Sequence, residues 1–89
     1  MDLANDVKYF AIVRDGDNPE HPSGLARRTT TPQGRLDEAL RRDMTWVRDS
    51  AIYEWERGEE MGADLVEISE KDAMRLIQAF RQEWGAQQG

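Results

Sequence analysis

The chain has 89 residues, with 18 acidic and 12 basic side chains, a net charge of −6 and no cysteine. This length allows one domain with a modest core, and the lack of cysteine excludes disulfides, thiolate nucleophiles and cysteine metal sites. From Trp46 onward, ten acidic residues stand against five basic ones. Such a negative half disfavours nucleic acid and anionic membranes and suits a basic partner, although solubility alone also accounts for it.

The N-terminal segment, residues 1–7, is polar, and we expect it to fray. It lacks the basic start and the apolar stretch of a signal peptide, and no segment of the chain is long and apolar enough for a membrane span. Together with the lack of cysteine, this predicts a cytoplasmic protein.

The first elements predict a hairpin over residues 8–30. The β-branched and aromatic run "KYFAIVR" leads into "DGDNPEHPSG", which is rich in turn formers, and "LARRTT" then resumes an extended pattern. The connection between the two strands is long and lacks apolar anchors. We therefore expect it to be dispensable for folding.

A helix is predicted next, over residues 32–47. Thr31 is a suitable N-cap, and Pro32 occupies the first helical position, where proline is favoured. The apolar residues that follow share one face at helical spacing. They are Leu36, Leu40, Met44 and Val47.

The segment "AIYEWERGEE", which follows Ser50, allows two interpretations. Val47, Ala51 and Trp55 continue the helical stripe, so one long central helix fits the spacing. In the alternative a strand begins at Ser50, because "RDS" contains short polar residues that compete with helical hydrogen bonds and "IYEW" is rich in strand formers. The strand also provides a mate for "DLVEIS", and we therefore prefer a hairpin over residues 50–68.

The last segment predicts a helix over residues 70–84. Ser69 and Asp72 have the spacing of a capping box, and Gly85 stands where a C-terminal glycine belongs. Residues 85–89 should be loose. The apolar positions of this helix form a wide stripe at helical spacing. They are Ala73, Leu76, Ile77, Phe80 and Trp84.

These elements predict a single α+β domain over residues 1–89. It has a four-stranded antiparallel sheet in ββαββα order, with both helices on one face. The alternative is an N-terminal hairpin followed by one long central helix and a C-terminal helix.

In the strand interpretation, Trp55 points toward the helices and belongs to the core, while Glu54 and Glu56 point to the open face of the sheet. Arg27 and Glu67 join them there in a cross-strand charge ladder. A carboxylate pair does acid–base chemistry only where its surroundings separate the two pKa values, which an open sheet face does not do. We therefore expect no catalytic residue in this segment.

The cluster "DGDNPEH" contains several side chains of the metal-binding types. A calcium loop that began at Asp15 would need glycine at its sixth position and glutamate at its twelfth, where the sequence has Glu20 and Ala26. His21, the only histidine, has no evident partner for proton transfer. We interpret the cluster as a solvated loop. Because phosphate-binding and nucleophile motifs are also missing from the sequence, we expect no metal, no cofactor and no enzymatic activity.

Arginines are numerous in the first half of the chain, but acidic residues stand among them. We therefore expect ion pairs within the chain, such as Glu38 with Arg42 at helical spacing, and no nucleic-acid-binding face.

The segments "YFAIVRDG", "EWERG" and "LVEISEKDA" resemble small uncharacterised proteins of actinobacteria, and the resemblance spans most of the chain. It implies a bacterial cytoplasmic protein with the order of strands and helices given above. It assigns no functional residue.

The sequence thus predicts a non-enzymatic interaction module that binds a protein partner, or a second copy of itself, through the sheet, whose edges can accept another strand. One alternative is a small-ligand or regulatory domain, with the ligand between the first loop and the sheet. Another is an acidic inhibitor or immunity-type protein against a basic partner. Trp84, near the C-terminus, belongs to the predicted core stripe of the last helix, with partial exposure to a partner as the alternative. The candidate partner-binding residues are Arg27, Glu54, Glu56, Glu67 and Trp84.

Overall fold

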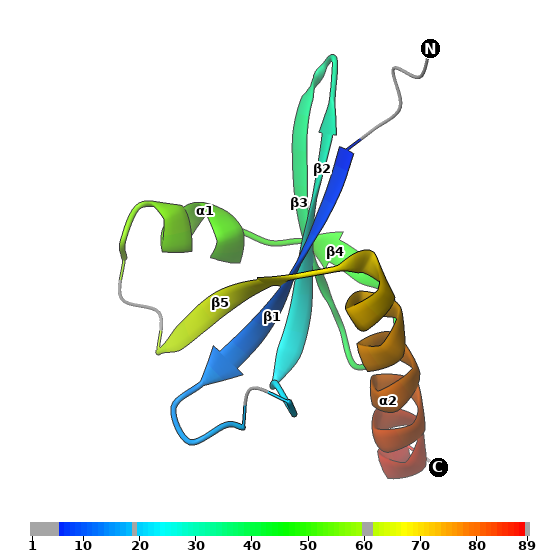
Figure 1. Ribbon diagram of the computed structural model, residues 1–89. Coiled ribbons are helices and arrows are strands. Elements are labelled where there is room, and N and C mark those ends of the chain that lie inside the picture. The colour runs from blue at the N-terminus through cyan, green and yellow to red at the C-terminus, as the bar shows by residue number, and fades with distance from the viewer. Residues whose placement is uncertain (1–5, 19, 60–61, 89) are drawn as a thin grey trace.

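The computed structural model describes residues 6–18, 20–59 and 62–88. It confirms the α+β class and contains a five-stranded antiparallel sheet with two helices (Figure 1). The strand order in the sheet is β4-β3-β2-β1-β5. The predicted four strands and the ββαββα order are therefore wrong. In chain order the elements are β1 (Asp6–Arg14), β2 (Gly24–Thr31), β3 (Gly34–Leu40), β4 (Trp46–Arg48), α1 (Ala51–Glu56), β5 (Ala63–Ile68) and α2 (Glu70–Gln88).

β1 and β2 pair as the N-terminal hairpin that the sequence predicts, with Phe10 opposite Ala26. The loop between them is tied at both ends by one side chain. The Asp17 carboxylate accepts the Arg14 backbone N–H at 2.8 Å and also accepts the Ser23 hydroxyl. These bonds fix the geometry of the loop where it leaves β1 and where it enters β2.

The same loop also has an apolar anchor. Pro22 is buried, and it lines a hollow on the surface together with Phe80 of α2. The expectation that the loop lacks apolar anchors is therefore wrong, and the loop belongs to the packing around α2.

β3 replaces the start of the predicted helix over residues 32–47. A tight turn precedes it, in which the Thr31 hydroxyl accepts the Gln33 N–H at 3.1 Å and donates to the Gly34 carbonyl at 3.2 Å. Gly34 has a φ of +141°, which favours glycine. Pro32 suits the second position of a turn as well as the first position of a helix, so it does not distinguish the two.

The apolar spacing of this segment is equally ambiguous. Leu36 and Leu40 are four residues apart, and positions four apart share a face in a helix and also in a strand. In the structure Leu40 is buried under α2, and Met44 lies in the loop after β3 with a φ of +69°. Val47 points to the other face of the sheet, because it pairs with Ala39.

The segment after Ser50 forms the six-residue helix α1. The predicted hairpin over residues 50–68 is therefore wrong, and so is the long central helix, because β4 ends before α1 begins. The Ser50 carbonyl accepts the Glu54 N–H at 2.9 Å, and the Asp49 carboxylate accepts the Ala51 N–H at 2.7 Å. β5 forms where "DLVEIS" predicts a strand, but it pairs with β1.

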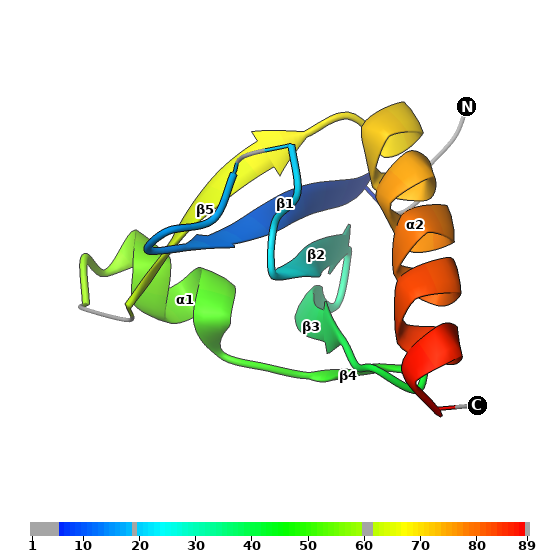
Figure 2. The same cartoon turned by 90° about the horizontal axis from the view of Figure 1, so that it is seen from below.

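The two helices lie on opposite faces of the sheet (Figure 2), so the prediction that both cover one face is wrong. Successive residues of a strand point to opposite sides. Accordingly Tyr9 and Leu25 belong to the core under α2, whereas Phe10 and Ala26 belong to the core under α1. Ile52 of α1 completes the second of these cores.

α2 begins where the sequence predicts it. The Ser69 hydroxyl accepts the Asp72 N–H at 3.1 Å, as in a capping box, and the predicted apolar stripe packs in the core. The helix continues through Gly85 to Gln88, so the predicted stop at that glycine is wrong. Of the ends predicted to fray, residues 1–5 and 89 lie outside the described residues, and β1 already begins at Asp6.

Candidate functional site

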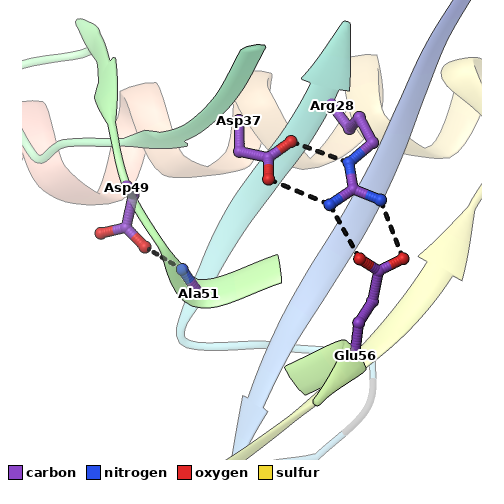
Figure 3. A network of polar contacts seen from close by, with 5 residues as sticks. All are labelled: Arg28, Asp37, Asp49, Ala51 and Glu56. Carbon is purple, nitrogen blue, oxygen red and sulfur yellow. Dashed lines mark hydrogen bonds and ion pairs between the residues drawn. The ribbon is translucent and has the colours of Figure 1, made fainter. Parts of the chain in front are cut away.

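Arg28 of β2 forms the centre of an ion-pair cluster between the sheet and α1 (Figure 3). Its guanidinium donates to both carboxylate oxygens of Asp37 on β3, from Nε at 2.8 Å and from Nη2 at 3.0 Å. It also donates to both oxygens of Glu56 in α1, from Nη1 at 2.8 Å and from Nη2 at 3.0 Å. Arg28 is only 8% exposed. These three residues, named here the α1 ion-pair cluster, are therefore a buried cation held by two carboxylates.

The electrostatics of the α1 ion-pair cluster indicate a structural role. The hydrogen bonds that Arg28 donates, to Asp37 first and then to Glu56, raise its pKa further above the ordinary value. The hydrogen bonds from Arg28 in turn lower the pKa of Glu56. Glu56 is therefore held as an anion, which suits a tie between α1 and the sheet and does not suit a general acid.

Arg27 lies on the opposite face of the sheet from Arg28, because neighbouring residues of β2 alternate. Its Nε donates to Glu38 at 2.9 Å, and its guanidinium carbon lies 4.0 Å from the centre of the Trp46 ring. Because Glu38 lies in β3 and Arg42 in the loop after it, no helix contains both residues, and the predicted helical pair of Glu38 with Arg42 is wrong. The broader prediction, that arginines pair with acids of the same chain, is confirmed for Arg27 and Arg28.

The predicted charge ladder is not assembled. Arg27 points to the side of α2, whereas Glu67 pairs with Phe10 and points to the side of α1. Glu54 accepts the Ser50 hydroxyl within α1. Glu56, the remaining member of the predicted ladder, belongs to the α1 ion-pair cluster.

Trp84 is buried, so its predicted place in the core stripe of the last helix is confirmed, and the alternative of partial exposure is wrong. It is 5% exposed and stacks on Phe80 with the ring centres 4.3 Å apart. The guanidinium carbon of Arg42 lies 5.5 Å from the centre of its ring. Its surroundings make it a core residue of α2.

β5 is the last strand of the sheet, and its outer side forms what we name the β5 edge (Ala63–Ile68). The Ile12 carbonyl of β1 accepts the Ser23 N–H at 2.8 Å, so Ile12 directs its backbone groups toward β2. Its opposite residue on β5, Leu65, is therefore in a non-hydrogen-bonded pair with it. Leu65 and Glu67 accordingly direct their N–H and C=O groups away from β1. The Glu67 N–H therefore points to the outer side of the sheet.

Two side chains flank the β5 edge. The Asp64 carboxylate accepts the Leu65 N–H at 3.0 Å and the Trp55 indole N–H at 3.0 Å. Trp55 is 37% exposed, and its ring centre lies 6.1 Å from that of Phe10. The predicted burial of Trp55 is therefore wrong, and the core position in α1 belongs to Ile52. The edge is partly covered by a carboxylate and bordered by an exposed indole.

Within residues 6–18, 20–59 and 62–88, no group of three or more histidine, aspartate or glutamate side chains is placed to hold a metal ion. His21 is exposed, and its backbone N–H donates to the Asn18 carbonyl at 2.7 Å. The Asn18 side chain accepts the Glu20 N–H at 2.9 Å. These contacts are those of a turn. No helix in the described part of the chain is long and apolar enough to cross a membrane.

Comparisons with protein-family models, with curated proteins and with solved structures found no match to this chain. Function has therefore to be inferred from the surfaces of the chain itself. Within the α1 ion-pair cluster the charged groups pair among themselves, and Arg27 pairs separately with Glu38. The β5 edge differs from them because it presents backbone groups that a partner can use.

Proposed function

We propose that this protein is a non-enzymatic interaction module of the bacterial cytoplasm that binds an extended, basic segment of a partner protein along the β5 edge. The observation that supports it best is the outward-facing backbone of Leu65 and Glu67 on a six-residue edge strand. A strand added there continues the sheet, which is a common mode of peptide recognition.

The two edges of the sheet differ in how well they serve this purpose. β4 has three residues, and such short edge strands are poor templates for a further strand. β5 has six residues, all paired with β1, so its backbone is held in an extended conformation before a partner arrives. Less conformational entropy is then lost on binding.

The side chains of the β5 edge favour a basic partner. Asp64 and Glu67 are exposed on opposite faces of β5, and a lysine or arginine of a neighbouring strand pairs favourably with whichever of them it faces. A cation that takes the Asp64 carboxylate also frees the Leu65 N–H for the new strand. Trp55 on one side and Val66, 45% exposed, on the other offer apolar contacts.

The net charge also favours a separate basic protein over a second copy of the chain as the partner. At −6, the chain attracts a basic segment and repels a second copy of itself. An acidic inhibitor or immunity-type protein against a basic target is one case of the same interaction. A hetero-partner is therefore favoured over self-association.

Short synthetic peptides that alternate lysine with valine or threonine test the proposal, with glutamate in place of lysine as the control. The lysine peptide should slow the hydrogen exchange of the Glu67 amide, as measured by NMR, and its affinity should fall as the salt concentration rises. Glu67→Pro removes an outward N–H and leaves the β1 side intact, because proline is tolerated on edge strands. This variant should lose the peptide, whereas Glu67→Gln, which keeps the N–H, should weaken binding only slightly.

Peptide binding by Glu67→Pro at the wild-type affinity would contradict the proposal. Equal protection of the Glu67 amide by the glutamate peptide would contradict the basic partner. Sedimentation of the protein alone provides the remaining check, because a dimer that Glu67→Pro abolishes would replace the basic segment with a second copy of the chain.

A further inference from the structure

An open groove of about 1040 Å³ lies beside the start of α1, at the end of the sheet where β1 and β3 finish and β2 begins. Its floor belongs to the face of the sheet that carries α1. The floor residues Ile12, Gly24, Ala39 and Ala63 all share that face, because strand registers pair them there. The small size of glycine and alanine leaves open volume over this part of the face, beside the first turn of α1.

The acidic side chains of the groove are already bound within the chain. Two of them line it. The Asp49 carboxylate accepts the Ala51 N–H at 2.7 Å, as Figure 3 shows, and Glu54 accepts the Ser50 hydroxyl. These two carboxylates therefore serve the start of α1.

Three arginines line the same groove and give its lining an excess of positive charge. Neither Arg14 nor Arg41 makes a side-chain hydrogen bond or an ion pair with a described residue. Asp17 and Asp43 attract them at longer range and are themselves hydrogen-bonded within their own loops. The third, Arg42, lies against an aromatic ring of α2. Two guanidinium groups are thus available at the rim of an apolar floor.

We propose that this groove binds a small anionic molecule with an apolar body, either a carboxylate or a phosphate ester. The apolar body lies on the floor formed by Ile12, Gly24 and Ala39, and the anionic group is bound by Arg14 and Arg41. This site shares only Ala63 with the β5 edge, and the proposed anion binding does not depend on peptide binding at that edge.

Size, donor chemistry and charge each support this ligand class. The groove is as large as the pockets that hold small ligands in proteins. Guanidinium groups match the geometry of carboxylates and phosphates, which they bind through paired hydrogen bonds. The chain as a whole has a net charge of −6, whereas three arginines and two acids line the groove, so the groove repels an anion less than most of the surface does.

An NMR titration with four probes tests the site. The probes are 3-phenylpropanoate, phenyl phosphate, the uncharged 3-phenylpropanamide and inorganic phosphate. At least one of the two aromatic anions should shift the backbone amides of Gly24, Ala39 and Ala51, and which of them binds more tightly distinguishes a carboxylate ligand from a phosphate ester. The uncharged amide should bind about tenfold more weakly than the carboxylate, or not at all, because it lacks a charge-assisted contact. Inorganic phosphate should bind more weakly than phenyl phosphate, because it lacks the apolar body.

Variants assign the contacts. Arg14→Gln and Arg41→Gln should each weaken binding of the preferred anion about tenfold. Arg81→Gln, which removes the same charge from an exposed position of α2, is the matched control and should leave the affinity unchanged. Gly24→Leu should block the floor. A Cβ at Gly24 lies 3.4 Å from Ile12 Cδ1, an ordinary contact, so Gly24→Ala fits there and provides a smaller block if the leucine variant does not fold.

Three results would overturn the proposal. The first is the lack of groove shifts with both aromatic anions at millimolar concentration. The second is equal affinity for the uncharged amide and the carboxylate. The third is a loss of affinity in Arg81→Gln as large as that in Arg41→Gln, because binding would then reflect overall charge.

Discussion

Ile52 is the side chain on which the packing of α1 depends most. It is 1% exposed and packs with Phe10, Ala26 and Leu65 on the face of the sheet opposite α2. Ile52→Ala removes three carbon groups, which at about 0.8 kcal/mol for each buried group amounts to about 2.4 kcal/mol. The cavity that remains should raise the loss to about 3–4 kcal/mol. A domain of this size is stable by about 5–10 kcal/mol, so the variant should still fold but unfold at a much lower urea concentration.

Urea unfolding followed by circular dichroism and tryptophan fluorescence measures this loss. Tyr53→Ala is the matched control, because Tyr53 lies on the same helix and is 45% exposed, and it should cost at most about 0.5 kcal/mol. Trp55→Ala should fall between them at about 1–2 kcal/mol, since it loses the contact with Phe10 and the hydrogen bond to Asp64. A loss below about 1 kcal/mol for Ile52→Ala, or equal losses for Ile52→Ala and Tyr53→Ala, would refute the burial argument.

Other parts of the fold give further predictions. Asp37→Asn removes a carboxylate from the buried Arg28 and should cost about 2 kcal/mol in urea unfolding, whereas an unchanged midpoint would show that Glu56 alone holds the cation. Because Arg28 lowers the pKa of Glu56 below its ordinary value of 4.5, the contribution of Glu56 to stability is full above that pH and is lost as the pH falls through the lowered value. Glu56→Gln should therefore flatten this part of the stability profile, and an unaltered profile would assign it to other acids. Pro22→Ser should cost about 1 kcal/mol if the buried proline anchors the first loop, and the same unfolding measurement checks it. Titration calorimetry should detect no tight binding of zinc, nickel or calcium, and a micromolar dissociation constant would contradict this expectation.

The apolar spacing explains why the sequence predicted α2 and why it wrongly predicted a helix over residues 32–47. From Ala73, the stripe of α2 continues at Leu76 and Phe80, three and seven residues on. Odd offsets place residues on opposite sides of a strand, but offsets of three and seven share a face of a helix. Leu36, Leu40 and Met44 are separated by even offsets, which both structures satisfy. Val47, seven residues after Leu40, has a helical offset only by coincidence, because it lies in β4 beyond the loop. Only the tight turn before β3 distinguishes them, and its proline also suits a helix start.

α1 illustrates a different limit of sequence reasoning. Its "IYEW" segment consists mostly of strand formers, and a helix of six residues is not stable by itself. The helix is stabilised by tertiary contacts, with Ile52 against the sheet and Glu56 on Arg28, which is 28 residues away in the sequence. Local propensity is a weak term against such contacts. The β5 edge and the groove depend on where α1 lies, so they were equally out of reach of sequence reasoning.

The arginine and acid pairs, by contrast, carried a signal in the sequence. The turn before β3 lies midway between Arg27 and Glu38, and also midway between Arg28 and Asp37. The structure pairs the two strands in this register. Because adjacent residues point to opposite faces, the two pairs place matched charges on both sides of the sheet at once, and a slip of one residue would lose both matches. These charges therefore fix the register of β2 against β3. A functional interpretation of the arginine pair overlooks this structural role. The surfaces left for a partner or a ligand are those whose polar groups the fold does not use. They are the backbone of β5 at Glu67 and the rim of the groove.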